Sequence, residues 1–374
     1  MNFKEIYEKS IKNPEDFWKS LSDDIFWFKK PTKILNSSNP PFYKWYEDGK
    51  TNTCYNAIDL HIENGLGDNT ALIYDSPITG NKAKYTFNEL KSRVSKFAGA
   101  LKNQGVEKGD RVVIYMPMVP EAVIAMLACG RIGAIHSVVF GGFASNELAS
   151  RIDDSKAKIL VTSSCGFEPN RTVEYRPLVD GALKLAKHKL EKVIFYQRKG
   201  HEIKLNAPLE ISWDESLVNA KDTDCLEMNS NDYAYILYTS GTTGVPKGIV
   251  RDIGGHIVAL KWTMKNIYNI DQGDVWWSAS DIGWIVGHSY IVYAPLFKGC
   301  TTVLFEGKPV GTPDAGAFWK IISDYKVKSL FTAPTAFRAI KKEDPEGKFF
   351  KKYDLSNFDT LFLAGERADP DTIK

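Results

Sequence analysis

Segments with strand and helix patterns alternate along most of this 374-residue chain. From Ala71 onward, short apolar runs at residues 111–116 and 158–162 alternate with helical patterns at 120–131 and 145–154. The same alternation resumes in the last third of the chain. Strands that alternate with helices are typical of mostly parallel sheets with helices on both faces. The sequence therefore predicts an α/β fold.

A polar stretch at residues 212–232 divides this pattern into two sub-blocks, so we expect a first α/β sub-block at 71–230 and a second at 231–374. The first should open with a hairpin and a helix over 88–103 that ends at Gly105. Residues 1–70 are irregular in pattern. They predict a lead-in segment that wraps the larger body, anchored by Trp18, Trp27 and Trp45.

Composition narrows the class of protein. The chain is 43% hydrophobic and 25% charged with a net charge of +2, so nothing favours nucleic acid as a partner. Five widely spaced cysteines form no Cys-x-x-Cys pair, which favours a reducing, cytoplasmic location. No targeting segment is evident, and the longest apolar stretch is far shorter than the ~20 residues that span a bilayer. A membrane association is therefore not expected.

A loop rich in glycine and hydroxyl groups follows the apolar run at 234–237. It reads Tyr-Thr-Ser-Gly-Thr-Thr-Gly-Val-Pro-Lys-Gly over residues 238–248. Glycines let backbone N–H groups approach an anion, and the hydroxyls and the lysine add donors and positive charge. An ordinary P-loop NTPase is disfavoured because Gly-Lys-Ser/Thr is not contiguous. A plain exposed turn is the alternative. We expect polyphosphate to bind at Thr239, Ser240, Gly241, Thr242, Thr243, Gly244 and Lys247.

Two further segments contain glycine turns. Residues 281–290 read Asp-Ile-Gly-Trp-Ile-Val-Gly-His-Ser-Tyr. Taken alone, Trp284 there could be a core ring and His288 a hydrogen-bonding group at a helix start. The strand expected at 360–363 runs into Gly-Glu-Arg at 365–367, at the end of a parallel strand where α/β folds bind ligands. A plain charged turn is equally compatible with that segment.

The loop at 238–248 resembles the phosphate-binding signature of the adenylate-forming enzymes, which include acyl-CoA synthetases, luciferases and peptide-synthetase adenylation domains. The resemblance covers nearly the whole chain. It implies the large N-terminal domain of that family, with two stacked α/β sub-blocks of mixed and parallel sheets, incomplete at the C-terminal end. It also implies ATP-dependent conversion of a carboxylate to an acyl-adenylate and pyrophosphate, followed by transfer to the thiol of coenzyme A. Lys247 would then hold pyrophosphate.

Segments 74–80, 247–252, 306–316 and 339–345 narrow the resemblance to the acetyl- and propionyl-CoA synthetase branch, closest to propionyl-CoA synthetase. Segment 331–338 resembles the family's thiol channel, where Thr335 would also cap a helix. The resemblance implies an acyl pocket, an adenine-binding turn and contacts to coenzyme A. The acyl pocket would consist of Trp284, Ile285, Val286 and Ala364. The adenine-binding turn would be Gly365, Glu366 and Arg367, and coenzyme A would contact Arg171 and Ala336.

Several positions depart from the pattern of acetyl-specific relatives. Ala364 stands where those enzymes have Val, which leaves room for one more methylene, worth about 0.8 kcal/mol of burial. Acetate should therefore be a slower substrate, not a rejected one. Val286 and Val310 replace a Thr and an Asn near the pantetheine arm, and Glu168 replaces one of two CoA-binding Arg residues.

The resemblance implies ATP, Mg²⁺ and coenzyme A as ligands, with small-molecule partners and no prediction of oligomeric state. The family's Mg²⁺-binding motif and adenylating lysine have no counterpart within residues 1–374. We therefore expect no metal site in this chain, little adenylation by the chain alone, and an exposed apolar sheet edge. Three alternatives stay open: an acetyl-CoA synthetase, a non-catalytic nucleotide-binding fragment, and a phosphotransferase, which is weakened because no motif places a general base.

Overall fold

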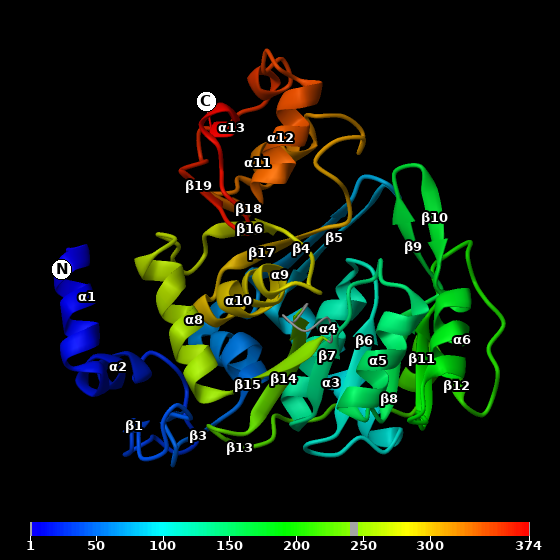
Figure 1. Cartoon of the computed structure of the whole chain (residues 1–374), viewed down its shortest axis with the longest axis horizontal. Helices are drawn as coiled ribbons and strands as arrows, with labels where there is room; N and C mark the ends of the chain where they lie inside the picture. Colours follow the sequence, from blue (N-terminus) through cyan, green and yellow to red (C-terminus); the bar gives the residue numbers. More distant parts are fainter. Residues whose placement is uncertain (1, 240–245, 374) are drawn as a thin grey trace.

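The computed structural model describes residues 2–239 and 246–373, and every structural statement below refers to these residues. They form two large β-sheets with helices between them and on their outer faces (Figure 1). The expected α/β fold of two stacked sub-blocks with mixed and parallel sheets is confirmed.

The larger sheet has seven strands, and all neighbouring pairs are parallel except the last, antiparallel pair. Its strands, in spatial order, are β12 (Glu210–Ser212), β11 (Lys192–Tyr196), β8 (Ile159–Ser163), β6 (Arg111–Tyr115), β7 (Ile135–Val138), β14 (Tyr233–Thr239) and β15 (Lys247–Asp252).

The smaller sheet has six strands and likewise ends in one antiparallel pair. Its strands, in spatial order, are β19 (Thr360–Leu363), β18 (Ser329–Thr332), β16 (Val275–Ala279), β17 (Thr301–Phe305), β4 (Thr70–Ser76) and β5 (Asn81–Thr86). Three two-stranded pairs complete the strands: β1 (Leu35–Asn36) with β2 (Lys44–Trp45), β3 (Lys50–Thr51) with β13 (Met228–Asn229), and β9 (Cys165–Glu168) with β10 (Arg171–Glu174).

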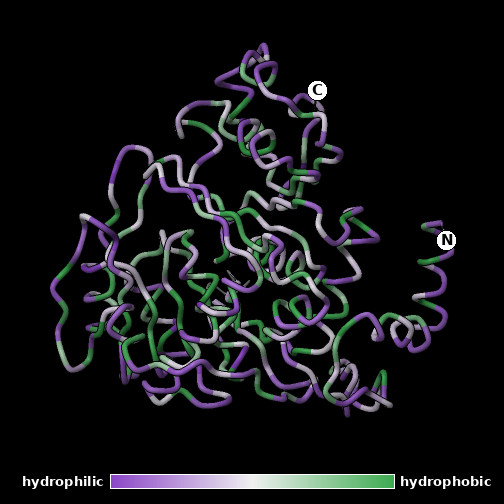
Figure 2. The backbone as a smooth tube through the Cα atoms, turned by 180° about the vertical axis from the view of Figure 1, so that it is seen from behind, coloured by the Kyte–Doolittle hydropathy of each residue, from purple (hydrophilic) through white to green (hydrophobic). Residues whose placement is uncertain are grey.

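Helices cover both faces of each sheet. Between the sheets lie α3 (Phe87–Asn103), α4 (Pro120–Ile132), α8 (Gly254–Asn266) and α10 (Ala294–Lys298). The outer face of the larger sheet packs on α5 (Ser145–Ser155) and α6 (Tyr175–Leu185), and that of the smaller sheet on α11 (Ala317–Tyr325) and α12 (Pro334–Glu343). Hydrophobic stretches of the backbone run through the interior of these layers (Figure 2).

Alternating side chains explain why both sheet faces are apolar. In β6, Val112 and Ile114 point into the core between the sheets, whereas Val113 and Tyr115 pack against α5 and α6. Successive strand residues point to opposite faces, so a strand covered on both sides reads as a continuous apolar run. This is the pattern from which the strands were predicted.

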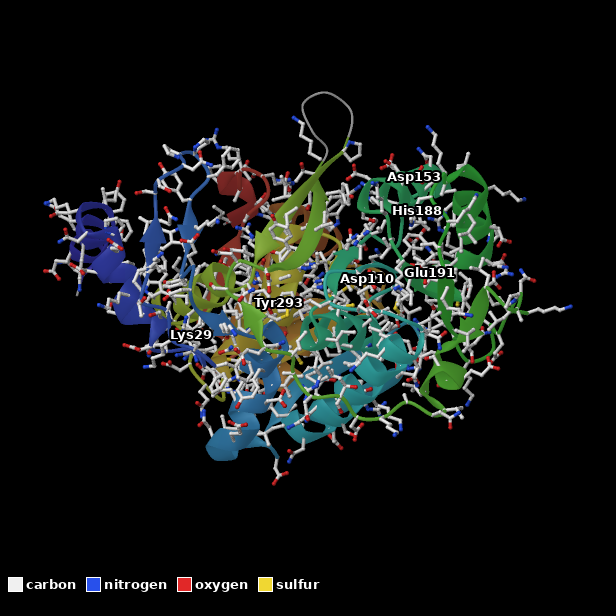
Figure 3. All side chains as sticks on the ribbon, turned by 90° about the horizontal axis from the view of Figure 1, so that it is seen from below. Lys29, Asp110, Asp153, His188, Glu191 and Tyr293 are labelled. Carbon is white, nitrogen blue, oxygen red and sulfur yellow. The ribbon has the colours of Figure 1, made fainter. Side chains whose placement is uncertain are left out.

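The remaining elements are short. They are α7 (Trp213–Leu217), α9 (Ile285–Gly287), α13 (Pro370–Ile373), the π-helices η1 (Tyr55–Asp59), η2 (Ile62–Leu66) and η3 (His288–Tyr293), and the 3₁₀ turn η4 (Phe350–Lys352). On the surface of the larger sheet, Asp153 accepts a hydrogen bond from the backbone N–H of His188 at 2.8 Å, and both residues are labelled in Figure 3.

The N-terminal region is more regular than its sequence pattern suggested. Two helices, α1 (Phe3–Lys12) and α2 (Pro14–Ser22), project from one side of the molecule (Figure 1). Asn2 and Glu5 form a capping box that starts α1, and Pro14 occupies the first turn of α2. Trp27 is buried, and Trp18 and Trp45 pack on the central core, as expected for aromatic anchors.

The two sheets exchange strands across the polar stretch at 212–232. Strands β4 and β5 lie in the sheet built mainly from the second half of the chain, and β14 and β15 lie in the sheet built mainly from the first half. The expected boundary at residue 230 therefore does not separate the two sheets. One core cluster joins both of them with the helices in between.

Of two predicted helix ends, the C-terminal end of α3 agrees with the structure and the N-terminal cap of α12 does not. Gly105 has a φ of +83° directly after the cap of α3, as expected for a helix-terminating glycine. The expectation that Thr335 caps the next helix is wrong. Helix α12 begins at Pro334 with Ala333 as its cap, because proline fits the first helical position, where its missing N–H has no partner to lose.

Candidate functional site

A cavity of about 820 Å³ lies where the carboxyl ends of strands from both sheets meet. The smaller sheet contributes residues that follow β16, β17, β18 and β19. The larger sheet contributes residues after β6 and β7 together with the β9–β10 hairpin. In α/β folds, ligands bind beyond the carboxyl ends of the strands, so this cavity is the candidate site.

All four residues expected in an acyl pocket line this cavity: Trp284, Ile285, Val286 and Ala364. Trp284 is 48% exposed and Ile285 50% exposed, so neither is a core residue. The Trp284 ring packs against Phe140 and Phe143, with ring centroids 5.5 and 5.9 Å away. One apolar face of the cavity therefore joins the two sheets through aromatic contacts.

The turn that presents Trp284 is built from short backbone contacts. The Asp281 carboxylate accepts a hydrogen bond from the Gly283 N–H at 2.7 Å, and the Asp281 carbonyl accepts one from the Trp284 N–H at 3.0 Å. A Cβ at Gly287 would lie 1.9 Å from that carbonyl oxygen, and one at Gly283 would lie 2.7 Å from the Cα of Phe140. Both positions therefore require glycine.

His288 fixes the same turn from behind. Its Nδ1 donates to the carbonyl of Ile282 at 3.1 Å, and its Nε2 lies 3.1 Å from Nε2 of His136 in β7. Burial lowers the pKa of His288 to about 4, so the ring is neutral at pH 7 and its Nε2 accepts the hydrogen bond from His136. Tyr293, near the centre of Figure 3, brings its hydroxyl within 3.0 Å of the same His136 nitrogen. His288 is therefore a hydrogen-bonding group at the start of a helix, which is the structural role that its sequence context suggests.

Asp281 is a carboxyl group of the cavity whose acidity is changed by burial. Burial raises its pKa to about 6, partly offset by the Gly283 N–H and by the positive charge of Lys308. Asp281 and Lys308 both line the cavity, and the Lys308 side chain is exposed there. The cavity lining therefore includes the Lys308 cation and, in Asp281, a carboxyl group that is protonated in mildly acidic solution.

A buried ion pair closes the opposite wall. Arg198 and Glu306 form two hydrogen bonds, and the hydroxyl of Tyr74 donates a third to Glu306 at 2.5 Å. The Arg198 guanidinium lies 4.6 Å from the centre of the Phe167 ring, which lines the cavity. Phe167 is therefore held in place by a charge that is itself fully paired.

The residues expected to contact coenzyme A both line the cavity. Arg171 lies on β10, and Ala336 lies in the first turn of α12. The Arg171 side chain is 71% exposed, and its Nε donates to Glu168 at 2.8 Å. Glu168 therefore pairs with the guanidinium that is expected to bind a phosphate of coenzyme A.

The expected adenine-binding turn is divided between the cavity and its rim. Gly365 lines the cavity with a φ of +95°, whereas Glu366 and Arg367 are exposed and do not line it. The Glu366 carboxylate accepts a hydrogen bond from the Thr335 N–H at 2.9 Å and pairs with Arg338. These contacts hold the turn against the start of α12.

The two described residues of the expected phosphate loop lie apart from the cavity lining. Thr239 and Lys247 face each other at the end of the antiparallel β14–β15 pair, and both are exposed. Neither is among the residues that line the cavity. Ser240, Gly241, Thr242, Thr243 and Gly244 lie outside the described residues.

The cavity-lining residues described here do not fit a Mg²⁺ ion. Both carboxylate oxygens of Glu306 are engaged by Arg198 and Tyr74, and Glu168 is paired with Arg171. Asp281 remains, and one carboxylate is a poor ligand set for a cation that requires about six oxygens. Within the described ranges, one group of three side chains is close enough to bind a metal, Cys54, Asp59 and Cys225, and none of them lines the cavity.

Sequence reasoning missed three charged groups of the site: Asp281, Glu306 and Lys308. Asp281 lies three residues before Trp284, and the other two lie in segment 306–316, whose sequence indicates the branch of the family but no site residue. Each follows a strand of the smaller sheet within three residues. The position just after a parallel strand was the available signal.

Comparison with known proteins places the chain in a family. Residues 61–374 match the family described as AMP-binding enzyme, and residues 3–57 match the family described as acetyl-coenzyme A synthetase N-terminus. The chain belongs to the AMP-binding enzyme family. Within it, the similarity is to the adenylate-forming short-chain acyl-CoA synthetases, which confirms the resemblance inferred from the motifs.

Curated relatives match the full length of the chain. It is 53% identical over 373 residues to the human protein named "Acyl-CoA synthetase short-chain family member 3, mitochondrial", covering 100% of this chain and 54% of that protein. It is 43% identical over 388 residues to "Propionate--CoA ligase" of Escherichia coli (strain K12), covering 100% and 59%, respectively. The chain thus spans somewhat more than half the length of these relatives.

The fold has a close solved counterpart. Acetoacetyl-CoA synthetase from Streptomyces lividans superimposes with a TM-score of 0.90 over 100% of this chain and 56% of that structure, at 23% identity. This similarity confirms the arrangement of sheets and helices. Across the described ranges, no helix has the length and apolar character needed to cross a membrane.

Proposed function

We propose that this chain forms the acyl- and CoA-binding region of a short-chain acyl-CoA synthetase that acts on propionate. The reaction would convert propionate, ATP and coenzyme A to propionyl-CoA, AMP and pyrophosphate through an acyl-adenylate. The observation that carries the proposal is that one cavity between the two sheets is lined by all the expected acyl-pocket residues, both expected CoA-binding residues and Gly365 of the expected adenine-binding turn. Family members use ATP and coenzyme A, which supports the same assignment.

The proposed roles follow the positions of the side chains. Trp284 and Ala364 would contact the alkyl chain, because both line the cavity and Trp284 has half of its surface free for a ligand. Gly365 would lie beside the adenine ring, with Glu366 and Arg367 at the rim. Arg171 and Ala336 would meet coenzyme A where it enters between the β9–β10 hairpin and α12.

Phosphate binding would involve the loop between β14 and β15, from Thr239 to Lys247. The proposal rests on its glycines and hydroxyls, which suit polyphosphate, and on the position of its two ends at the tip of an antiparallel pair. Lys308 is a further cation available to an anionic ligand inside the cavity. Mg²⁺ would have to be held by groups other than the described residues of this cavity.

The preference for propionate over acetate rests on Ala364. Its methyl group leaves space that a Val would fill, and one methylene is worth about 0.8 kcal/mol of burial, or about fourfold in affinity. Acetate would therefore be a weaker substrate of the same site. One of the curated relatives carries propionate in its name, which supports this choice.

We also propose that the 374-residue chain alone binds these ligands but forms acyl-adenylate very slowly. Support comes from the resemblance, in which the lysine that drives adenylation has no counterpart within residues 1–374. Propionate-dependent exchange of pyrophosphate into ATP by the purified chain would contradict this. A cytoplasmic location stays a prediction, because the human relative is named as mitochondrial.

A binding experiment tests the proposed function on this chain. Adenosine 5′-propyl phosphate mimics propionyl-adenylate without reacting, and we expect it to bind more tightly than adenosine 5′-ethyl phosphate in calorimetric titrations. Ala364→Val should remove that preference, whereas Ala83→Val, on β5 and outside the cavity lining, should retain it. Equal affinity for both esters in the unmodified chain would contradict the assignment of propionate. Absence of binding would contradict the function.

A further inference from the structure

Two cysteines meet beneath the N-terminal region, away from the cavity. Cys54 lies just before η1, and Cys225 lies in the segment between α7 and β13. Their sulfur atoms and the Asp59 carboxylate lie within 4.8 Å of one another. Arg131, near the end of α4, reaches all three groups and is itself buried.

The Arg131 guanidinium forms the hub of this cluster. Its Nη1 lies 3.0 Å from Cys225 Sγ, 3.4 Å from Cys54 Sγ and 2.6 Å from Asp59, and its Nη2 lies 3.0 Å from the other Asp59 oxygen. A guanidinium already fills the position between the three candidate ligands. The geometry therefore disfavours a metal ion there and favours a negatively charged sulfur.

The net charge of the cluster also favours a negatively charged sulfur. Lys91 also pairs with Asp59, at 2.9 Å, so two cations share one carboxylate. One thiolate would neutralise the cluster. Although burial opposes ionisation, the hydrogen bond from Cys225 and the charge of Arg131 lower the pKa of Cys54, while burial raises that of Cys225. Cys54 is therefore the sulfur of the pair that ionises more readily.

This pair differs from the other three cysteines in its exposure to solvent. All five cysteines of the chain are described, and Cys225 is the one that is partly exposed. It lies in a stretch without helix or strand, next to exposed Leu226. Cys129, Cys165 and Cys300 are buried. Cys54 and Cys225 are therefore a pair in which one cysteine is partly open to solvent.

We propose that Cys54 and Cys225 are a peroxide-sensitive dithiol that forms a reversible disulfide. The thiolate of the pair attacks one oxygen of hydrogen peroxide, so an S–O bond forms, the O–O bond breaks, and hydroxide leaves and takes up a proton. The second thiol loses its proton and attacks the sulfenic sulfur, forming the S–S bond and releasing water. Two thiols and one peroxide yield one disulfide and two water molecules.

The same charges make the disulfide easy to reduce. Oxidation removes the thiolate and leaves Arg131 and Lys91 with Asp59 as their one carboxylate partner. Because the reduced form gains an ion pair that the oxidised form lacks, the equilibrium favours the dithiol. We therefore expect ordinary dithiols to reverse the bond rapidly.

Peroxide titration of the 374-residue chain tests the proposal. The native protein is treated with hydrogen peroxide in the presence of EDTA, alkylated, and mapped by mass spectrometry. We expect one intramolecular link between the peptides that contain Cys54 and Cys225, loss of two of the five thiols, and full recovery with dithiothreitol. Cys225→Ser and Cys54→Ser should each abolish the link.

Controls distinguish this result from unspecific oxidation. Cys129→Ala, which changes a buried cysteine of α4 outside the cluster, should form the link as the unmodified chain does. Because Cys54→Ser could disturb the core, circular dichroism of each variant confirms its fold, and Cys225→Ser at the surface gives an independent answer. Links that involve other cysteines, unchanged thiols at Cys54 and Cys225, or stoichiometric Zn²⁺ binding that protects both thiols from peroxide would overturn the proposal.

Discussion

Arg198 and Glu306 form a bidentate ion pair that joins the two sheets at the wall of the cavity, with Nη1–Oε1 and Nη2–Oε2 distances of 2.8 and 3.0 Å. Arg198 follows β11 of the larger sheet, and Glu306 follows β17 of the smaller one. Both are buried, and the Tyr74 hydroxyl completes the hydrogen bonds of the carboxylate. This charge pair therefore links the two sheets at the site, in addition to the aromatic contacts of Trp284 with Phe140 and Phe143.

Glu306→Gln should destabilise the protein strongly. The new glutamine has the shape of glutamate but carries no negative charge, so the buried Arg198 guanidinium would be left without a counter-charge. An unpaired buried charge costs about 3–5 kcal/mol. Urea unfolding should show this loss, whereas Glu346→Gln, at an exposed pair with Lys348, should change stability by less than about 1 kcal/mol. Equal effects in the two variants would contradict a structural role for the buried pair.

Asp281→Asn should alter how stability depends on pH. Asp281 holds its proton up to about pH 6 in the folded state but only to about 3.8 when unfolded, so folding binds a proton between these values. The free energy of unfolding therefore falls as pH rises through this window. The variant should lack that fall and be more stable at pH 7 by about 1–3 kcal/mol.

Urea unfolding from pH 4 to 7 measures this difference. Asp222→Asn provides the control, because Asp222 is exposed and outside the cavity lining. Parallel curves for the Asp281→Asn variant and the unmodified protein would show that burial does not raise the pKa of this carboxyl group.

Gly287→Ala should disrupt the turn that carries Trp284. Its Cβ would lie 1.9 Å from the Asp281 carbonyl oxygen, so the turn has to open, at a cost of about 1–3 kcal/mol of overpacking. Binding of adenosine 5′-propyl phosphate should weaken as well. Gly255→Ala, where the added methyl meets ordinary contacts on α8, should instead be neutral or stabilising by up to about 1 kcal/mol. Unchanged ligand affinity in the Gly287 variant would place the ligand away from this turn.

Glu168→Gln should strengthen the binding of coenzyme A. The change frees the exposed Arg171 from its charged partner and removes a carboxylate near the ligand phosphates, an effect of up to about fivefold for an exposed pair. Arg171→Gln should weaken binding, and Arg93→Gln, outside the cavity lining, should leave it unchanged. Calorimetric titration with coenzyme A decides the question, and identical affinities across the three variants would remove Arg171 from the binding site.

Local patterns were sufficient for many individual elements. Helix α4 lies within one residue of its predicted bounds, because its apolar run, its opening proline and Gly133 mark both ends. Helices α1 and α2 were missed although the Asn2–Glu5 capping box was present in the sequence, because α1 buries none of its residues and therefore shows little core pattern. Strand exchange was not predictable, since the pairing of Leu72 with Thr302 joins segments far apart in the chain.

The candidate site likewise combines residues that local motifs indicate with residues that only the fold brings together. Trp284, Ala364 and Gly365 each lie in a recognisable segment, and all three line the same cavity. Their roles in binding stay predictions. The Arg198–Glu306 pair was missed because it forms only when two sheets meet, and neither residue lies in a motif that predicts its partner. Long-range charge pairs of this kind require the fold before they can be seen.

A crystal structure of the 374-residue chain with adenosine 5′-propyl phosphate is the decisive test of the proposed function. We expect ligand density in the cavity between the two sheets, with the propyl group against Trp284 and Ala364 and the adenine beside Gly365. Density at another surface, or an empty cavity under conditions in which calorimetry shows the ester bound, would contradict it.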